Sequence, residues 1–281
     1  MNQLSKESKV RRHLLASTVA LVATVGMFGG STAFAVTPAE IKTKGTLTVG
    51  IQADNPPWGY VNSKGEAEGI DADMANLFAK ELGVKVTFVP LDVASRIPAL
   101  TSGRVDMLFA TMAMNPERAK AVQFSKPYVA NQIKLLAPKT TEIKTNADMG
   151  KYVIGVPRAA IQDTDVTKNA PPGTNIRRFD GDAATIQALL SGQVQAIGGN
   201  VMYIKRLDEA KPGVYENKLE FSALYNGVCT RLGEKEINAA LNAFIDKIKA
   251  NGELAAIQTK WMGSSMTRFP EQLEGIPFVA Q

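Results

Sequence analysis

The chain has 281 residues, 45% of them hydrophobic, and a formal net charge of +5. Several basic residues lie near the N-terminus, and without residues 1–35 the net charge is about +2, so no charge pattern typical of nucleic-acid binding remains. The single cysteine, Cys229, excludes an internal disulfide. The single histidine, His13, lies within residues 1–35, which we interpret below as a segment that is removed. Metal sites and cofactors are therefore not expected.

The N-terminal segment has the pattern of a cleavable export signal. The basic residues Lys9, Arg11 and Arg12 precede an apolar run from Leu14 to Phe28, and the small-residue sequence Ala33-Phe34-Ala35 follows. The run is shorter than the roughly 20 apolar residues that a membrane-spanning helix needs. We interpret residues 1–35 as a signal peptide and expect a soluble periplasmic product with no lipid anchor at the cleavage site.

The next segments alternate between strand and helix patterns. Thr37, Pro38 and Glu40 indicate a capped helix start, and Gly45 is a typical helix end. A buried strand is predicted over 47–51. Apolar residues at helical spacing predict a helix over 70–82 that ends at Gly83, and an extended pattern resumes over 84–89. The order strand, helix, strand is typical of α/β proteins.

An internal repeat suggests two similar halves. Ile97–Val105 recurs as Ile186–Val194 with most positions identical, and each copy predicts a helix end, a glycine stop and a strand, over 105–110 and 194–199. Two α/β lobes follow if the repeat is real; chance similarity of two helix-strand corners is the alternative.

The repeat places Thr111 and Asn200 at equivalent positions just past the carboxyl ends of their strands. Ligands bind at such strand ends in open α/β sheets. Two lobes that face each other through these ends would form a cleft between domains, which is a common place for a small-molecule pocket.

Motifs in chain order then carry a family resemblance. They are Gly50 with Pro56-Pro57-Trp58, Gly69 to Asp73, Arg96 to Leu100, Pro116 to Arg118, Phe124 to Tyr128, and Lys260 to Gly263. Over residues 40 to 265 the sequence resembles the amino-acid-binding family (family 3) of periplasmic solute-binding proteins of ABC importers.

The resemblance implies the type II periplasmic binding protein fold. This fold is α/β and has two lobes, each a mixed sheet flanked by helices, joined by two crossover strands. Lobe one is expected over 36–136 and 230–281, lobe two over 139–226, and the hinges near 136–138 and 227–231. Closure of such lobes around a ligand is the expected motion.

Arg118 is the first candidate for ligand binding. Asn115 and Pro116 mark a helix start, which places Arg118 in the first turn beside free backbone N–H groups. A guanidinium there suits a carboxylate, which it can hold with two parallel hydrogen bonds. The resemblance implies that Arg118 binds the ligand's α-carboxylate together with Thr111; the alternative is a surface arginine that contacts Glu117 or solvent.

The resemblance implies further contacts from both lobes. In lobe two the turn Arg158-Ala159-Ala160-Ile161 would donate backbone N–H groups across the cleft. A glycine and small hydroxyl residues are usual at Ala159, Ala160 and Ile161, so side-chain donors are missing here. Arg96 would face the distal part of the ligand and favour a second carboxylate, with a solvated helix-end arginine as the alternative. Trp58 would wall the pocket or lie in the core, and Asn55 stands where a stacking tyrosine is common.

The expected partners of an α-ammonium are absent. The family's usual aspartate and hydroxyl align with Asn200 and Ala113. We therefore expect a ligand that lacks an α-ammonium or carries its amine elsewhere, unless Asp54 or Glu66 supplies the carboxylate from another direction.

The predicted function is capture of an amino acid or related carboxylate for the membrane permease of an ABC importer, by a monomer that is not an enzyme. The alternatives are a solute-sensing module and a catalytically adapted, dehydratase-like member of the same fold. Catalysis has little chemical support, because the predicted mature chain offers no histidine and no readable pair of carboxylates.

Overall fold

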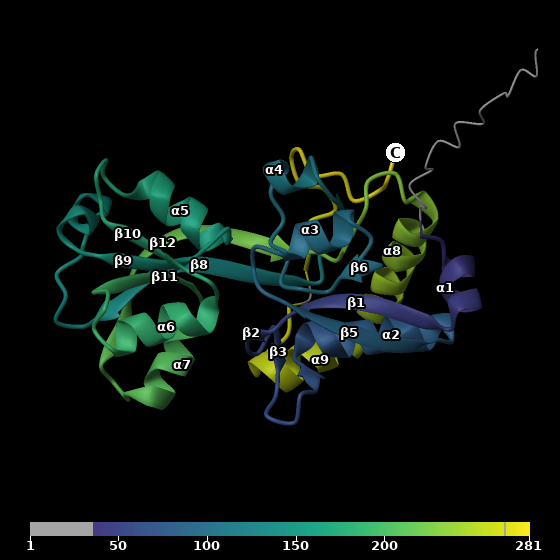
Figure 1. Ribbon diagram of the computed structural model, residues 1–281, viewed down its shortest axis with the longest axis horizontal. Coiled ribbons are helices and arrows are strands. Elements are labelled where there is room, and N and C mark those ends of the chain that lie inside the picture. The colour runs from purple at the N-terminus through teal and green to yellow at the C-terminus, as the bar shows by residue number, and fades with distance from the viewer. Residues whose placement is uncertain (1–35, 267) are drawn as a thin grey trace, which may run out of the picture. The chain divides into compact units, whose positions relative to one another are not determined.

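The computed structural model describes residues 36–266 and 268–281, so the predicted signal peptide lies outside the described residues. Two five-stranded mixed sheets, each with its own helices, make up most of the described chain, and a small three-stranded sheet accompanies the first (Figure 1). Within the described residues, none of the helices has the length and apolar character needed to cross a membrane.

The first sheet has the strand order β5-β1-β6-β13-β7. Its strand β1 pairs in parallel with β5 and β6, whereas β13 is antiparallel to β6 and β7. The strands are β1 (Thr46–Gln52), β5 (Lys85–Leu91), β6 (Met107–Leu108), β7 (Gln123–Phe124) and β13 (Cys229–Thr230), and the small sheet has β2 (Asp54–Asn55), β3 (Gly59–Val61) and β4 (Ala67–Glu68). The helices are α1 (Pro38–Lys44), α2 (Ile70–Leu82), α3 (Arg96–Thr101), α4 (Pro116–Ala119), α8 (Lys235–Ala250) and α9 (Glu253–Met262). We call this part lobe one.

The second sheet has the strand order β10-β9-β11-β8-β12. Its strand β9 pairs in parallel with β10 and β11, and β8 is antiparallel to β11 and β12. The strands are β8 (Val129–Pro138), β9 (Ile154–Pro157), β10 (Ile176–Phe179), β11 (Ala196–Asn200) and β12 (Tyr215–Asn226). The helices are the 3-10 helix η1 (Asn146–Lys151), α5 (Ile161–Asn169), α6 (Asp182–Leu190) and α7 (Tyr203–Ala210). We call this part lobe two.

The predicted helix starts and stops are confirmed. Thr37 and Glu40 form the capping box of α1, with the Glu40 amide 3.2 Å from Thr37 Oγ1, and α1 ends at Gly45. The two copies of the repeat also occupy equivalent places. Helix α3 leads into β6 beside β1, and α6 leads into β11 beside β9. Gly103 lies between α3 and β6, and Gly192 lies between α6 and β11. Both have a left-handed backbone, with φ of 76° and 75°.

The lobes are joined by β8 and β12, which lie side by side (Figure 1). After β12 ends at Asn226 the chain continues into β13 of lobe one, and the expected crossing near 227–231 stays a prediction. The outgoing crossing differs from the expectation at 136–138, because residues 133–136 already pair with β11 in the second sheet. The chain therefore enters lobe two at the start of β8, several residues earlier than the sequence suggested.

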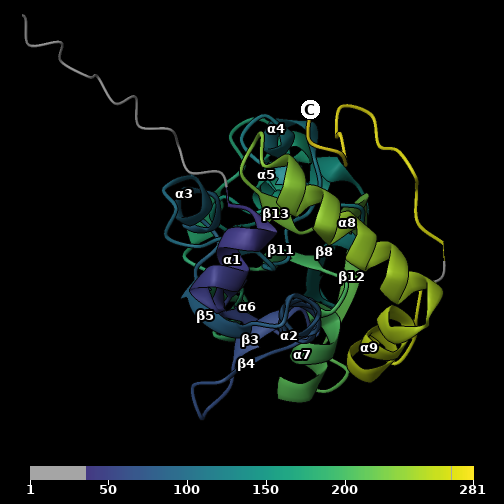
Figure 2. The ribbon, with the colours of Figure 1, turned by 90° about the vertical axis from the view of Figure 1, so that its right-hand side faces the viewer.

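The core of lobe one lies between β1 and the helices α2 and α8. It contains large buried side chains such as Phe78, Phe109 and Phe244. Figure 2 shows α8 and α9 at the front of the view, with the C-terminal segment passing beside α8. Asn242 on α8 donates to the Phe278 carbonyl of that segment at 2.6 Å.

Candidate ligand-binding site

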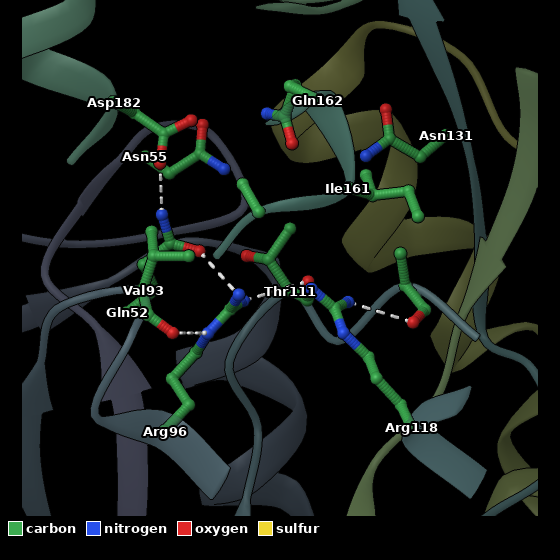
Figure 3. Close-up of a pocket in the computed structure, with 12 residues that line it drawn as sticks. Gln52, Asn55, Val93, Arg96, Thr111, Arg118, Asn131, Ile161, Gln162 and Asp182 are labelled. Carbon is green, nitrogen blue, oxygen red and sulfur yellow. Dashed lines mark hydrogen bonds between the residues drawn. The ribbon is translucent and has the colours of Figure 1, made fainter. Parts of the chain in front are cut away.

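A small cavity lies at the strand ends between the two lobes (Figure 3). It leaves about 20 Å³ for the centres of water-sized molecules, which is room for roughly one or two waters. Its lining residues come from both lobes. They are Gln52, Asn55, Val93, Arg96, Thr111, Ala113, Arg118, Asn131, Ala160, Ile161, Gln162 and Asp182.

Arg118 reaches this cavity from the short helix α4. Asn115 accepts the Arg118 amide at 2.7 Å and Pro116 occupies the first turn, as the sequence predicts. The guanidinium donates to the Ala113 carbonyl at 3.0 Å and, across the cleft, to the Ala159 carbonyl at 3.3 Å. Burial and the neighbouring Arg96 lower the pKa of Arg118 to about 9, which leaves it charged at neutral pH.

Arg96 lies on the floor of the cavity and is held by backbone carbonyls. Its Nη1 donates to Ala110 at 2.7 Å and Thr111 at 3.2 Å, and its Nε donates to Val93 at 3.0 Å. Gln52 Oε1 accepts a further bond from Nη1 at 3.3 Å. With 4% of its surface exposed, Arg96 is a rigid buried cation rather than the solvated helix-end arginine of the alternative interpretation.

Thr111 lines the cavity, but its donors are engaged inside lobe one. Its amide and hydroxyl lie 2.7 and 3.0 Å from Asp71 Oδ2, and Tyr128 donates to the other oxygen of Asp71. From the sequence we expected Thr111 to contact the ligand's carboxylate together with Arg118. Asp71 lies forty positions away in the sequence, so this competing acceptor had no local signal.

The lobe-two turn contributes Ala160 and Ile161 to the lining, together with Gln162. Ala160 caps α5 without a side-chain bond, so the first amides of α5 have no partner inside the helix. Arg158 is not among the lining residues; its Nε is 3.6 Å from Asp180, and more than half of its side chain is exposed.

Three other predicted residues have different environments. Asn55 lines the cavity and accepts a bond from Asn200 Nδ2 at 3.1 Å. Asn200 also accepts the Met202 amide at 2.9 Å, so both ends of its amide are engaged, and it is not among the lining residues. Trp58 is fully buried in the core of lobe one and is not among the lining residues.

Asp182 is a lining residue that the sequence argument missed. It is the first residue of α6 and is 1% exposed. Tyr203 donates to one carboxylate oxygen, and Gln52 of lobe one donates to the other. Burial, and to a smaller extent the Asp54 carboxylate, raises the pKa of Asp182 to about 6. Gln52 could have been predicted from the sequence, because it is the last residue of β1 and ligands bind at the carboxyl ends of strands in open α/β sheets. The same reasoning selected Thr111 and Asn200.

Neither carboxylate proposed as a replacement ammonium partner lines the cavity. Asp54 accepts the Ala183 amide of lobe two at 3.0 Å and lies against Gly181, where a side chain would collide with it. Glu66 is exposed and accepts a bond from Asn62 at 3.0 Å. The cleft is thus closed by direct contacts between the lobes, and the buried acidic group that faces it is Asp182.

The arrangement matches a known class of binding protein. Residues 47–264 match the family described as bacterial extracellular solute-binding proteins, family 3. The L-cystine-binding protein TcyJ of Escherichia coli (strain K12) is 28% identical over 269 residues, which is 94% of this chain and 100% of that protein. The ABC transporter glutamine-binding protein GlnH of Bacillus subtilis is 30% identical over 233 residues, 80% of this chain and 84% of that protein.

Solved structures agree. A solute receptor for L-cysteine of Neisseria gonorrhoeae has a TM-score of 0.76 at 29% identity and covers 81% of this chain and 94% of its own. An ancestral arginine-binding protein bound to arginine has a TM-score of 0.74 at 33% identity, covering 78% and 99%. The fold is the type II two-lobed periplasmic binding protein fold. The chain therefore belongs to the bacterial extracellular solute-binding proteins of family 3.

Proposed function

We propose that this protein is the periplasmic solute-binding component of an ABC importer and that it captures an amino acid or a related small carboxylate between its two lobes. Arg118 is the observation that carries this proposal. Its guanidinium lines the cavity and bonds backbone carbonyls of both lobes, and no acidic side chain of the described residues forms an ion pair with it. A largely buried cation without an anion is costly, and a ligand carboxylate would compensate it.

The relatives support the class of ligand. Those described above are proteins for cystine, glutamine, cysteine and arginine, all of them amino acids. The predicted signal peptide supports a periplasmic location, and the family supports a membrane permease as the partner of the loaded protein. We expect the protein to act as a monomer, since each lobe supplies half of one cleft.

Binding without turnover is part of the proposal. Among the lining residues the only acidic side chain is Asp182, and none is a histidine, cysteine or lysine; the Thr111 hydroxyl is bonded to Asp71, which does not line the cavity. A product assay run beside calorimetry with amino acids and matched organic acids separates the two classes, because an enzyme would consume a solute that it binds.

The variant Arg118→Ala tests the carboxylate assignment. Loss of the guanidinium leaves the ligand carboxylate unpaired, at a cost of about 3 to 5 kcal/mol, so the dissociation constant of the best wild-type solute should rise by a factor of hundreds. Arg118→Lys is the matched variant that keeps the charge without the fork and should lose less. Circular dichroism confirms that both fold. Affinity unchanged in Arg118→Ala would refute the assignment.

A further inference from the structure

The lining residues divide into two ends with different chemistry. At one end Arg118 bonds the Ala113 carbonyl, and Ala113 packs in one apolar cluster with Ile161. At the other end Gln52 joins Arg96 to Asp182 through hydrogen bonds from both ends of its amide. Figure 3 shows Asp182 and Arg118 on opposite sides of the cavity, with Arg96 and Thr111 between them.

The end near Arg118 offers nothing acidic to an ammonium group. Ala113, Ala160 and Ile161 have no polar side-chain atom, and Asn131 is a neutral amide. An α-ammonium is attached to the carbon that carries the carboxylate, so a ligand held by Arg118 would place it at this end. A desolvated ammonium there would have no counter-ion.

Asp182 at the other end is built to receive a donor. Tyr203, from the same lobe, bonds one carboxylate oxygen and fixes the side chain. The second oxygen has its donor from Gln52, which belongs to the opposite lobe. When the lobes separate, that oxygen loses its partner, so a donor group from a ligand would take the place of the Gln52 amide.

We propose that Asp182 is the counter-ion for a cationic group, an amine or a guanidinium, that the ligand carries at the end remote from its carboxylate. In this structure the Gln52 amide occupies this position. This inference rests on the proposed function, in which Arg118 binds the ligand's carboxylate. The ligand is therefore a carboxylate with a distal cation, and the α-amine contributes little to its affinity.

The charges around Asp182 are consistent with this role. Asp54 raises the pKa of Asp182 in addition to burial, whereas Tyr203, Arg206 and Arg96 lower it, and the value of about 6 leaves the group ionised at neutral pH. A ligand cation binds the ionised form. Affinity for a cationic ligand should therefore fall as the pH drops below about 6, while affinity for a simple carboxylate should not follow the same curve.

Calorimetry with probes of one carbon skeleton tests the proposal. Caproate carries the carboxylate alone, norleucine adds an α-amine, ε-aminocaproate adds a distal amine, and lysine has both; butyrate and γ-aminobutyrate give a shorter pair. In at least one of the pairs ε-aminocaproate/caproate and γ-aminobutyrate/butyrate, the wild-type protein should bind the probe with the distal amine about tenfold more tightly than the simple acid. It should bind norleucine no more tightly than caproate.

The variants separate the possible causes. Asp182→Asn is nearly isosteric and should remove the preference for the distal amine while caproate or butyrate binds as before. Glu66→Gln, which changes an exposed carboxylate of the same lobe that does not line the cavity, is the control and should leave the affinity for every probe unchanged. If Asp182→Asn does not fold, the wild-type comparison at pH 5 and pH 7.5 replaces it, and the amine preference should shrink at the lower pH.

Two results would overturn the proposal: no preference for a distal amine in the wild-type protein, or the same preference in Asp182→Asn. The variant Arg118→Ala tests the proposed function separately from this inference. If that variant binds every probe as the wild type does, the carboxylate assignment is wrong, whereas the role of Asp182 is judged from the paired probes.

Discussion

Asp71 organises the strand end on which Arg96 and Thr111 depend. Its carboxylate accepts both donors of Thr111 and the hydroxyl of Tyr128. Thr111 has a φ of 52°, which is unfavourable for a β-branched residue, and the bonds to Asp71 offset that cost. The same strand end presents the carbonyls of Ala110 and Thr111 that hold Arg96. Asp71 thus supports the site without lining it.

The protonation of Asp71 gives a stability prediction. Burial raises its pKa from 3.8 to about 6, although Tyr128, Thr111 and Arg96 act in the opposite direction. The folded protein therefore binds this proton more tightly than the unfolded chain, so the contribution of Asp71 to stability falls as the pH rises from about 4 to 6. Relative to Asp71→Asn, the wild-type free energy of unfolding should fall by up to about 3 kcal/mol over that range.

Urea unfolding at pH 4.5 and pH 7.5 measures this difference. Glu66→Gln, which changes an exposed carboxylate, is the control and should show a much smaller pH effect. A wild-type to Asp71→Asn difference that is the same at both pH values would contradict the assignment.

Short-range signals explain which residues of the site were predictable. The cap of Asn115 and the proline after it lie within three positions of Arg118, so the sequence could place that guanidinium. Asp182 faces the cavity through a contact with Gln52, which lies in the other lobe and far away in the sequence. Nothing near Asp182 distinguishes it from an ordinary acidic residue in the first turn of a helix, and its role depends on closure.

At the scale of elements, the C-terminal segment supports helix α4. Gly275 lies in a turn pressed against Pro116, and a side-chain carbon at Gly275 would stand 3.3 Å from the proline ring. Gln123, just after α4, donates to the Pro277 carbonyl at 2.7 Å. Because α4 has only four residues, it has little stability of its own, and these contacts help to hold Arg118 in place.

Replacement of Gly275 by alanine should therefore loosen α4. The residue has a φ of 69°, and its new side chain would press on Pro116. Hydrogen exchange of the peptide over 115–122, measured by mass spectrometry without ligand, should speed up by about tenfold. Gly83→Ala is the matched control, since its φ is 71° and nothing lies within 4 Å of the added carbon. Equal exchange of this peptide in the two variants would show that the contact between Gly275 and Pro116 does not stabilise α4.

The elements themselves were largely predictable, and the crossing between lobes was not. Caps and glycine stops lie next to the helices that they end, so α1 and α2 could be read from the sequence. Strand β8 is continuous from Val129 to Pro138 and carries no turn signal before its last residue. Its place in the second sheet along its whole length depends on its partners β11 and β12, which the sequence of β8 does not specify.

At the scale of the whole described molecule, the cleft is closed by the protein's own polar groups. Gln52 bonds Asp182, Asn55 bonds Asn200, Arg118 bonds the Ala159 carbonyl, and Asp54 bonds the Ala183 amide. The remaining cavity holds a water or two, so an amino acid can enter only after the lobes have moved apart. A ligand that is held by both lobes must therefore replace some of these contacts, and the interlobe bonds that remain favour the closed arrangement.

Asp54 allows that equilibrium to be tested without changing the cavity lining. Its carboxylate accepts an amide at the start of α6, where the helix dipole favours a negative charge, and Gly181 leaves room for the approach. Asp54→Ala should shift the unliganded protein toward the open form, with a larger radius of gyration in X-ray scattering than the wild type. A saturating solute should restore the smaller value, because ligand contacts with both lobes exist only after closure. The affinity of the variant for that solute should fall by roughly tenfold.

Glu66→Ala removes an exposed carboxylate of the same lobe and should leave the scattering profile unchanged. If Asp54→Ala and the wild type scatter alike both with and without solute, the Asp54 contact does not control closure.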